Sequence, residues 1–261
     1  LVPLGLGVWI SLRNGSLLSS TSEFVGLKNY TTLLKGSPFW DSVKVTLVIS
    51  VLSLAVQLPL GFLLAVVIHR ELAGTRFFRS SLLLPLLLTP VAVGLMWRLM
   101  LNIDNGVIDG LLQQFGLPAI DWLGNRTVAI FSVVLVDSWQ NVPLVMLLIL
   151  AGLQSLPVGP LEAARVDGAS TLQVYRHVIL PLLAPVGLVV VMIRIIESVK
   201  LFDIIYILTS GGPGTATQNV SLLDYRLGFT FLQTSKAAAL GVIICITLVP
   251  IYRLWKRANA S

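Results

Sequence analysis

The sequence has little charge. Asp, Glu, Lys and Arg together make up 11% of its 261 residues, about half the share of roughly 25% that is usual in soluble globular proteins. Mean hydropathy is correspondingly high, at +0.89. This deficit excludes an ordinary soluble domain and indicates an integral membrane protein. The net charge of +6 then favours contact with anionic lipid headgroups of the bilayer, not with nucleic acid.

The sequence is also poor in residues that build reactive sites. The single cysteine, Cys245, lies in an apolar stretch, which excludes an intrachain disulfide and a thiolate metal cluster. The two histidines, His69 and His177, stand at no metal-ligand spacing. No Ser/His/Asp or Cys/His set stands at a defensible catalytic spacing, and no G-x-x-x-x-G-K-[ST] phosphate loop is present. We therefore expect no catalytic residue, no metal site and no ATPase activity in this chain.

Long apolar runs are what the sequence has instead. Thr46–Ile68 contains no charge and, at about 1.5 Å per helical residue, crosses a hydrocarbon core of roughly 30 Å. Further spans are predicted at Ser80–Trp97, Val128–Leu153, Leu180–Leu208 and Ala237–Trp255. Leu1–Leu12 is apolar but short, so we interpret it as a truncated first span. The predicted fold is an all-α integral membrane protein with six transmembrane helices.

One membrane domain accounts for most of the chain. Residues 1–40 form the truncated first helix and an outer loop, residues 41–257 form a core of five spans, and residues 258–261 form a C-terminal tail. Basic residues concentrate in three segments, which we place in the cytoplasm together with both termini. These residues are Arg70, Arg76 and Arg79, then Arg165 and Arg176, then Arg253, Lys256 and Arg257.

A polar loop, residues 155–181, separates two of the most apolar runs. Pro160 suits the first position of a short helix, and Glu162 then falls in its first turn, near the positive end of the helix dipole. Gly168 follows as a bend, and Ser170 with Gln173 predicts a capping box for a second short helix. Neither helix is long enough to span, so we expect both to lie at the membrane surface. An ordinary helical hairpin is the alternative.

This loop resembles the EAA loop of binding-protein-dependent ABC importer permeases. The matching residues are Glu162-Ala163-Ala164, Asp167-Gly168-Ala169, and Val178 with Leu180-Pro181, where Val178 replaces the usual isoleucine of the pattern. The FVGLKNY segment at residues 24–30 and the GGP segment at residues 211–213 are similar to the maltose-type, carbohydrate-uptake branch, and to its first permease in particular.

The resemblance implies partners. Such permeases pair with a second permease subunit as a heterodimer and with two ATPase subunits, which bind ATP and Mg²⁺. They receive substrate from an extracellular lipoprotein or periplasmic binding protein, in the inner membrane of a bacterium or archaeon. Glu162 would face a basic residue in an ATPase cleft, Gly168 would supply the bend, and Ala163, Ala164 and Ala169 would allow close approach.

Charged residues also occur inside the predicted spans. Arg194, Glu197, Lys200 and Asp203 fall three residues apart in the fifth span, so on a continuous helix they would line one drifting face. Each charge costs at least ~2.5 kcal/mol near a helix centre on insertion scales, so the four should face protein or water. They either line a substrate pathway or form a self-neutralised structural ladder.

A second polar patch lies in the fourth span, at Asp137, Trp139, Gln140 and Asn141. An aromatic ring beside amide groups suits a sugar, although Trp139 also suits simple packing. The resemblance to the carbohydrate-uptake branch, together with this patch, predicts a carbohydrate permease, and the same resemblance implies glycerol 3-phosphate or a glycerophosphodiester as the alternative substrate. The alternatives from other classes are an ion-coupled secondary transporter and an intramembrane enzyme, and for the enzyme the sequence offers no paired nucleophile and base.

Overall fold

The computed structural model describes residues 2–15, 23–69 and 75–258. The fold is helical apart from a hairpin of two-residue strands, β1 (Arg13–Asn14) and β2 (Glu23–Phe24), which the all-α prediction did not include. Arg70 of the predicted cytoplasmic loop and residues 259–261 of the predicted tail lie outside the described residues. The helices in chain order are α1 (Val2–Ser11), α2 (Lys28–Lys35), α3 (Ser37–His69), α4 (Thr75–Leu87), α5 (Pro90–Met100), α6 (Val107–Gln114), α7 (Arg126–Gln154), α8 (Val158–Val166), α9 (Thr171–Val174), α10 (Leu180–Val199), α11 (Asp203–Leu208), α12 (Val220–Tyr225) and α13 (Thr234–Ala258), with π-helical turns η1 (Tyr175–Ile179) and η2 (Arg226–Thr230).

Three helical stretches in the described ranges are long and apolar enough to cross a membrane: α3, α7, and the continuous run Thr171–Val199. The bent pair α4–α5 makes a fourth if it counts as one span. By length and composition the described part of the chain thus supports three to four spans. Helix α1 and the apolar part of α13, Thr234–Leu248, are shorter, so the count of six stays a prediction.

Helix α3 buries its polar face and exposes its apolar one. Ser42, Thr46, Ser50, Ser53 and Gln57 follow one another at three- to four-residue intervals and are all buried, whereas leucines and valines on the other face are exposed. This arrangement suits a helix whose outer face meets lipid, because small and polar residues allow close helix packing there. At Gly61 the approach of α7 is so close that an added Cβ would lie 2.5 Å from Val145.

The predicted third span is broken. Helices α4 and α5 meet at an angle of 101°, where we expected one helix over Ser80–Trp97. Pro90 is the first residue of α5 and disfavours helical backbone at Thr89, which is extended (φ −67°, ψ 142°) and caps α5 through its side chain. The bend therefore has a local cause in the sequence.

The observed helix of the fifth span differs from the predicted one at both ends. It begins earlier, because η1 joins α9 to α10 without a break, and it ends at Val199 instead of Leu208. Lys200 caps α10, and the chain turns before α11 starts at Asp203. The second short helix of the 155–181 loop is thus the first turn of a long rod, and not a separate surface helix.

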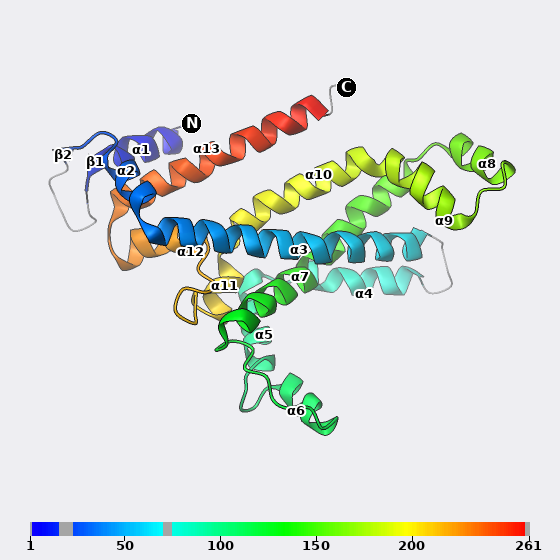
Figure 1. Cartoon of the computed structure of the whole chain (residues 1–261), viewed down its shortest axis with the longest axis horizontal. Coiled ribbons are helices and arrows are strands. Elements are labelled where there is room, and N and C mark those ends of the chain that lie inside the picture. Colours follow the sequence, from blue (N-terminus) through cyan, green and yellow to red (C-terminus); the bar gives the residue numbers. More distant parts are fainter. Residues whose placement is uncertain (1, 16–22, 70–74, 259–261) are drawn as a thin grey trace.

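Figure 1 shows α8 and α9 at one end of the molecule, with α2 and the β-hairpin at the other. Helix α3 runs between these ends, whereas α7 and α10 extend from the middle of the molecule toward α8 and α9 (Figure 1). The three helices share an apolar core that includes Ala65, Met146, Leu150 and Val190. A second core cluster packs α5 and α11 against α7. This framework places the middle of α7 beside the last turns of α10.

Candidate functional site

A buried ion pair ties three helices together. Arg194 of α10 is 2% exposed, and its Nη2 donates to both carboxylate oxygens of Asp137 on α7, each at 3.2 Å. Its Nε donates to Gln57 Oε1 of α3 at 2.7 Å. The Gln57 Nε2 in turn donates to Asp137 Oδ2 at 2.8 Å. Because three helices share one charge-assisted hydrogen-bond network, the network links their positions at this depth.

A polar cavity of about 350 Å³ lies beside this network. It is lined by residues of the α4–α5 bend, the middle of α7, the end of α10 and the start of α11. Seven of the eight predicted pathway residues line it: Asp137, Gln140, Asn141, Arg194, Glu197, Lys200 and Asp203. Two segments that are distant in the sequence, residues 137–141 and 194–203, therefore line one cavity. Leu201 and Phe202 of the second segment also belong to its wall.

The predicted charge ladder is only partly a helical face. Arg194 Nη1 lies 3.9 Å from Glu197 Oε2, and Glu197 Oε1 lies 4.0 Å from Lys200 Nζ. Lys200, however, is already the cap of α10, and Asp203 begins a different helix. Arg194 also pairs with Asp137 on α7 at 3.2 Å, so its charge is neutralised across two helices as well as along α10, and both the pathway and the ladder interpretations stay predictions.

Free hydrogen-bonding capacity remains in the cavity wall. The Nη1 atom of Arg194 is buried and makes no hydrogen bond among the described residues, since Glu197 lies beyond hydrogen-bond distance. Buried donors are normally paired. This guanidinium N–H and the half-exposed Glu197 carboxylate thus lie side by side at the cavity wall, and of the two the carboxylate is accessible as an acceptor.

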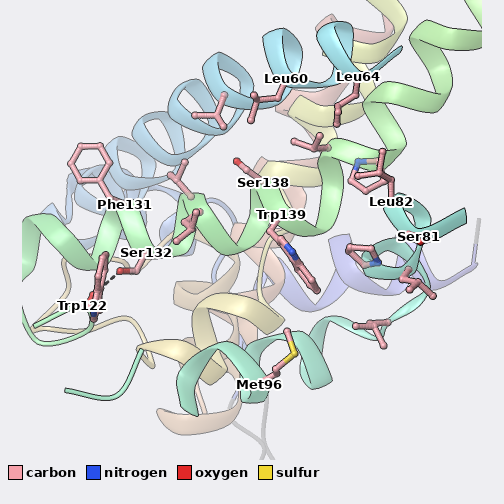
Figure 2. Close-up of a pocket in the computed structure, with 18 residues that line it drawn as sticks. Leu60, Leu64, Ser81, Leu82, Met96, Trp122, Phe131, Ser132, Ser138 and Trp139 are labelled. Atoms are coloured by element: carbon pink, nitrogen blue, oxygen red, sulfur yellow. Dashed lines mark hydrogen bonds between the residues drawn. The ribbon is translucent and has the colours of Figure 1, made fainter. Parts of the chain in front are cut away.

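Trp139 is the predicted pathway residue that the polar cavity does not include. Its ring packs edge-on against Trp97 at 5.7 Å between centroids, and it lines a separate apolar cavity of about 950 Å³ (Figure 2). That cavity lies between α3, α4 and α7, with Leu60, Leu82 and Phe131 among its walls. The packing interpretation of Trp139 therefore agrees with its position.

Gln57 and Phe202 are site residues that sequence reasoning missed. Gln57 lies within a charge-free apolar run, and a search for charges passes over it, although an amide in a span also needs a partner. Phe202 is an apolar residue in an apolar stretch, so its type does not distinguish it from a packing residue. Its place in the cavity wall depends on the chain turn after α10, which the uninterrupted apolar pattern did not reveal.

The loop between α7 and α10 has the helix–bend–helix form that the sequence predicts. The capping box is present, with Ser170 N donating to Gln173 Oε1 at 2.7 Å and Gln173 N to Ser170 Oγ at 3.4 Å. Gly168 adopts φ +78°, and backbone hydrogen bonds Gly168 N to Arg165 O and Ala169 N to Ala164 O close a Schellman motif. Specific backbone hydrogen bonds therefore hold the bend.

Two details of this loop differ from the prediction. Helix α8 starts at Val158, so Pro160 is its third residue and Glu162 follows the first turn. Proline is tolerated there because first-turn N–H groups have no helical acceptor. Glu162, Ala163 and Asp167 are exposed, whereas Ala164 and Ala169 are partly buried and pack against the core under the loop.

Exposed apolar side chains accompany the exposed acids of the loop. Val158, Val166 and Leu172 are 62%, 86% and 77% exposed. They lie on α8 and α9, at the end of the molecule farthest from the β-hairpin (Figure 1). Within the described ranges no cluster of three or more His, Cys, Asp or Glu side chains could hold a metal ion.

Comparison with known proteins places this chain in a family. Residues 57–258 match the binding-protein-dependent transport system inner membrane component family, and the chain belongs to it. A probable ABC transporter permease of Sinorhizobium fredii is 39% identical, with 100% of this chain and 86% of the relative covered. The trehalose/maltose transport system permease of Thermococcus litoralis is 38% identical over 84% of this chain and 74% of its own length.

Two further likenesses bear on the fold and on the range of relatives. The sn-glycerol-3-phosphate transport system permease of Escherichia coli is 32% identical over 95% of this chain and 84% of its own length. A chain in the crystal structure of a bacterial alginate ABC transporter, in complex with an alginate pentasaccharide-bound periplasmic protein, superposes with a TM-score of 0.79 at 25% identity. That match covers 90% of this chain and 82% of the other.

Proposed function

We propose that this protein is the permease subunit of an ATP-driven importer and forms half of the translocation pathway for a carbohydrate. An extracellular binding protein delivers the sugar, and a second permease subunit supplies the other half of the pathway. The observation that carries this proposal is the polar cavity, in which α7, α10 and α11 bring charged and amide groups together inside an otherwise apolar protein of this family. Carbohydrate names recur among its relatives.

The chemistry of the cavity favours a neutral, hydroxylated substrate over a phosphorylated one. Its wall holds three acidic side chains, Asp137, Glu197 and Asp203, against two basic ones, Arg194 and Lys200. Arg194 is already committed to Asp137, so a phosphate would meet net negative charge. Glycerol 3-phosphate therefore remains the second candidate, supported by the similarity to a permease with that name.

The α8–α9 loop is the proposed site of energy coupling. Its exposed carboxylate, Glu162, stands between exposed apolar side chains, a combination typical of a protein interface. Partner ATPases would bind ATP and Mg²⁺, close on this loop and pull the long rod Thr171–Val199 with it. The cavity would then pass from inward-facing to outward-facing. We propose that the helices cross the cell (inner) membrane of a bacterium or archaeon. Both termini and this loop would then lie on its cytoplasmic side.

Purification of the complex tests this proposal. The tagged chain, extracted in mild detergent, should copurify with a phosphate-loop ATPase and with a second permease, both identified by mass spectrometry. Glu162→Lys should reduce ATPase recovery at least several-fold, because it reverses the exposed charge of the loop. Glu23→Lys is the matched control, since Glu23 is also exposed but lies in the β-hairpin at the opposite end. Recovery of the chain alone, or equal recovery with both variants, would refute the coupling assignment.

A further inference from the structure

Four aromatic rings form a continuous row that starts at the polar cavity. We define this aromatic row as Phe202, Tyr206, Tyr225 and Phe229. Phe202 lines the cavity; its ring stacks on Tyr206 at 5.3 Å and contacts Tyr225 at 4.9 Å between centroids. Tyr225 then contacts Tyr206 at 5.3 Å and stacks on Phe229, also at 5.3 Å.

The row leads from the cavity to the surface. Phe202 and Tyr225 are partly buried, Tyr206 is 39% exposed, and Phe229 is 69% exposed. The rings come from the turn after α10, from α11, from α12 and from η2. In Figure 1 these elements lie away from α8 and α9, toward the end that carries the β-hairpin. The elements that carry the exposed rings thus lie toward the end where substrate would arrive under the proposed function.

The rings hold one another in place. Tyr206 lies edge-on against Tyr225 and raises the pKa of the Tyr225 hydroxyl. The planes of Phe202 and Tyr206 are 18° apart, and those of Tyr225 and Phe229 are 28° apart. Such aromatic pairs contribute a favourable interaction energy in addition to the burial of apolar area. Row members are therefore oriented before any ligand arrives, which reduces the entropy lost on binding.

We propose that the aromatic row is a binding surface for the pyranose rings of an oligosaccharide whose leading end occupies the polar cavity. A pyranose ring presents C–H groups on its faces, and these weakly positive hydrogens meet the negative face of an aromatic ring. The cavity volume of about 350 Å³ is at the low end for ligand pockets, so an oligosaccharide extends beyond it. Phe202 belongs to both surfaces and joins them. This inference rests on the proposed carbohydrate function and specifies its substrate class.

Saturation-transfer NMR tests the aromatic row directly. The probes are maltotetraose and maltose, each added to the purified complex in nanodiscs, with saturation of the aromatic protons of the protein. Phe229→Leu and Tyr206→Leu keep apolar volume but remove the ring face, so each should weaken maltotetraose binding about threefold to tenfold. A larger part of maltose fits in the cavity, so the same two variants should weaken maltose binding less than maltotetraose binding.

Two control variants separate stacking from packing. Tyr206→Phe keeps the ring and should bind maltotetraose like the wild type. Phe231→Leu removes a 55% exposed ring that is not a member of the row, and it should also leave binding unchanged. The proposal is wrong if maltotetraose shows no transfer in the wild type, if all variants behave alike, or if the Leu variants lose the second permease without losing sugar contact. The last result would identify the row as a subunit interface. Copurification with the ATPase is measured separately. The importer assignment and the role of the aromatic row can therefore each fail while the other holds.

Discussion

Arg194 illustrates how a single buried charge is made tolerable in this protein. The side chain is 2% exposed, and its nearest counter-ion is Asp137, which is equally buried. Gln57 completes the network from a third helix. A buried pair is costly to form but far more costly to break, because removal of one partner leaves an uncompensated charge.

We therefore expect Asp137→Asn to destabilise the protein strongly, by about 3–5 kcal/mol. Glu197→Gln is the matched control, because Glu197 is also an acid near Arg194 but is half-exposed and lies 3.9 Å away. It should cost ~0–1 kcal/mol of stability while changing substrate preference or KM. Thermal unfolding in detergent measures the difference. Equal unfolding temperatures for the two variants would contradict the structural role of Asp137.

At this scale the sequence predicted most of the polar cavity. The charged and amide residues of α7 and α10 were identifiable because such side chains are expensive in an apolar span and need an interior partner. Their pairing was not predictable, since Asp137 and Arg194 are 57 positions apart. Gln57 and the row member Tyr225 gave no signal that separates a site residue from a packing residue.

Among the structural elements, α8 and α9 are related by a bend that depends on one backbone angle. Gly168 has φ +78°, and an added Cβ there would meet nothing within 4 Å. The restriction at this position is therefore conformational, not steric crowding by neighbours. Asparagine tolerates the left-handed region, whereas a β-branched residue does not.

Substitutions at Gly168 should accordingly separate by backbone preference. Gly168→Asn should retain most of the ATPase stimulation by loaded binding protein, and Gly168→Val should lose most of it, because the strained bend costs about 1–3 kcal/mol. Gly159→Ala is the control, since Gly159 also has open space but no positive φ. ATP hydrolysis and uptake are measured together in proteoliposomes. Equal coupling in the Asn and Val variants would show that the bend is not required.

Element ends were the least predictable part of the fold. The capping box and glycine bend were legible because each uses a local, named interaction. The break between α4 and α5 has a proline signal, but α7 and α10 contain Pro143 and Pro185 without a break. A proline alone therefore does not decide between a continuous and a bent span, because neighbouring helices can satisfy the freed carbonyl.

For the molecule as a whole, Asp224 links stability to pH. It lies in α12, outside the candidate spans, and its Oδ1 is buried without a hydrogen bond among the described residues. Burial raises the pKa of the Asp224 carboxyl from 3.8 to about 6. The folded state thus binds the proton more tightly than the unfolded state, so folding stability decreases as pH rises from about 4 to about 6.

Asp224→Asn should remove this pH dependence. At pH 7 the variant should be more stable than the wild type by about 1–2 kcal/mol, discounted for partial exposure, and the two should converge below about pH 4. Unfolding midpoints in detergent across this range provide the measurement. A variant less stable than the wild type at pH 7 would mean that the carboxylate has a favourable partner.

The apolar surface of the whole molecule indicates which neighbours it needs. Leu60, Leu63 and Val67 of α3 remain largely exposed, as do leucines of α4 and α5. Lipid or a second membrane subunit can cover such faces, and water cannot do so favourably.

The unbroken helix from Thr171 to Val199 has a mechanical consequence. Its 29 residues make a lever roughly 43 Å long, with the α8–α9 loop at one end and Arg194 and Glu197 near the other. If such a lever tilts by about 10° around its middle, each end moves by ~4 Å in opposite directions. A displacement of that size at the loop would reshape the polar cavity at once, with no signal relayed through intermediate side chains.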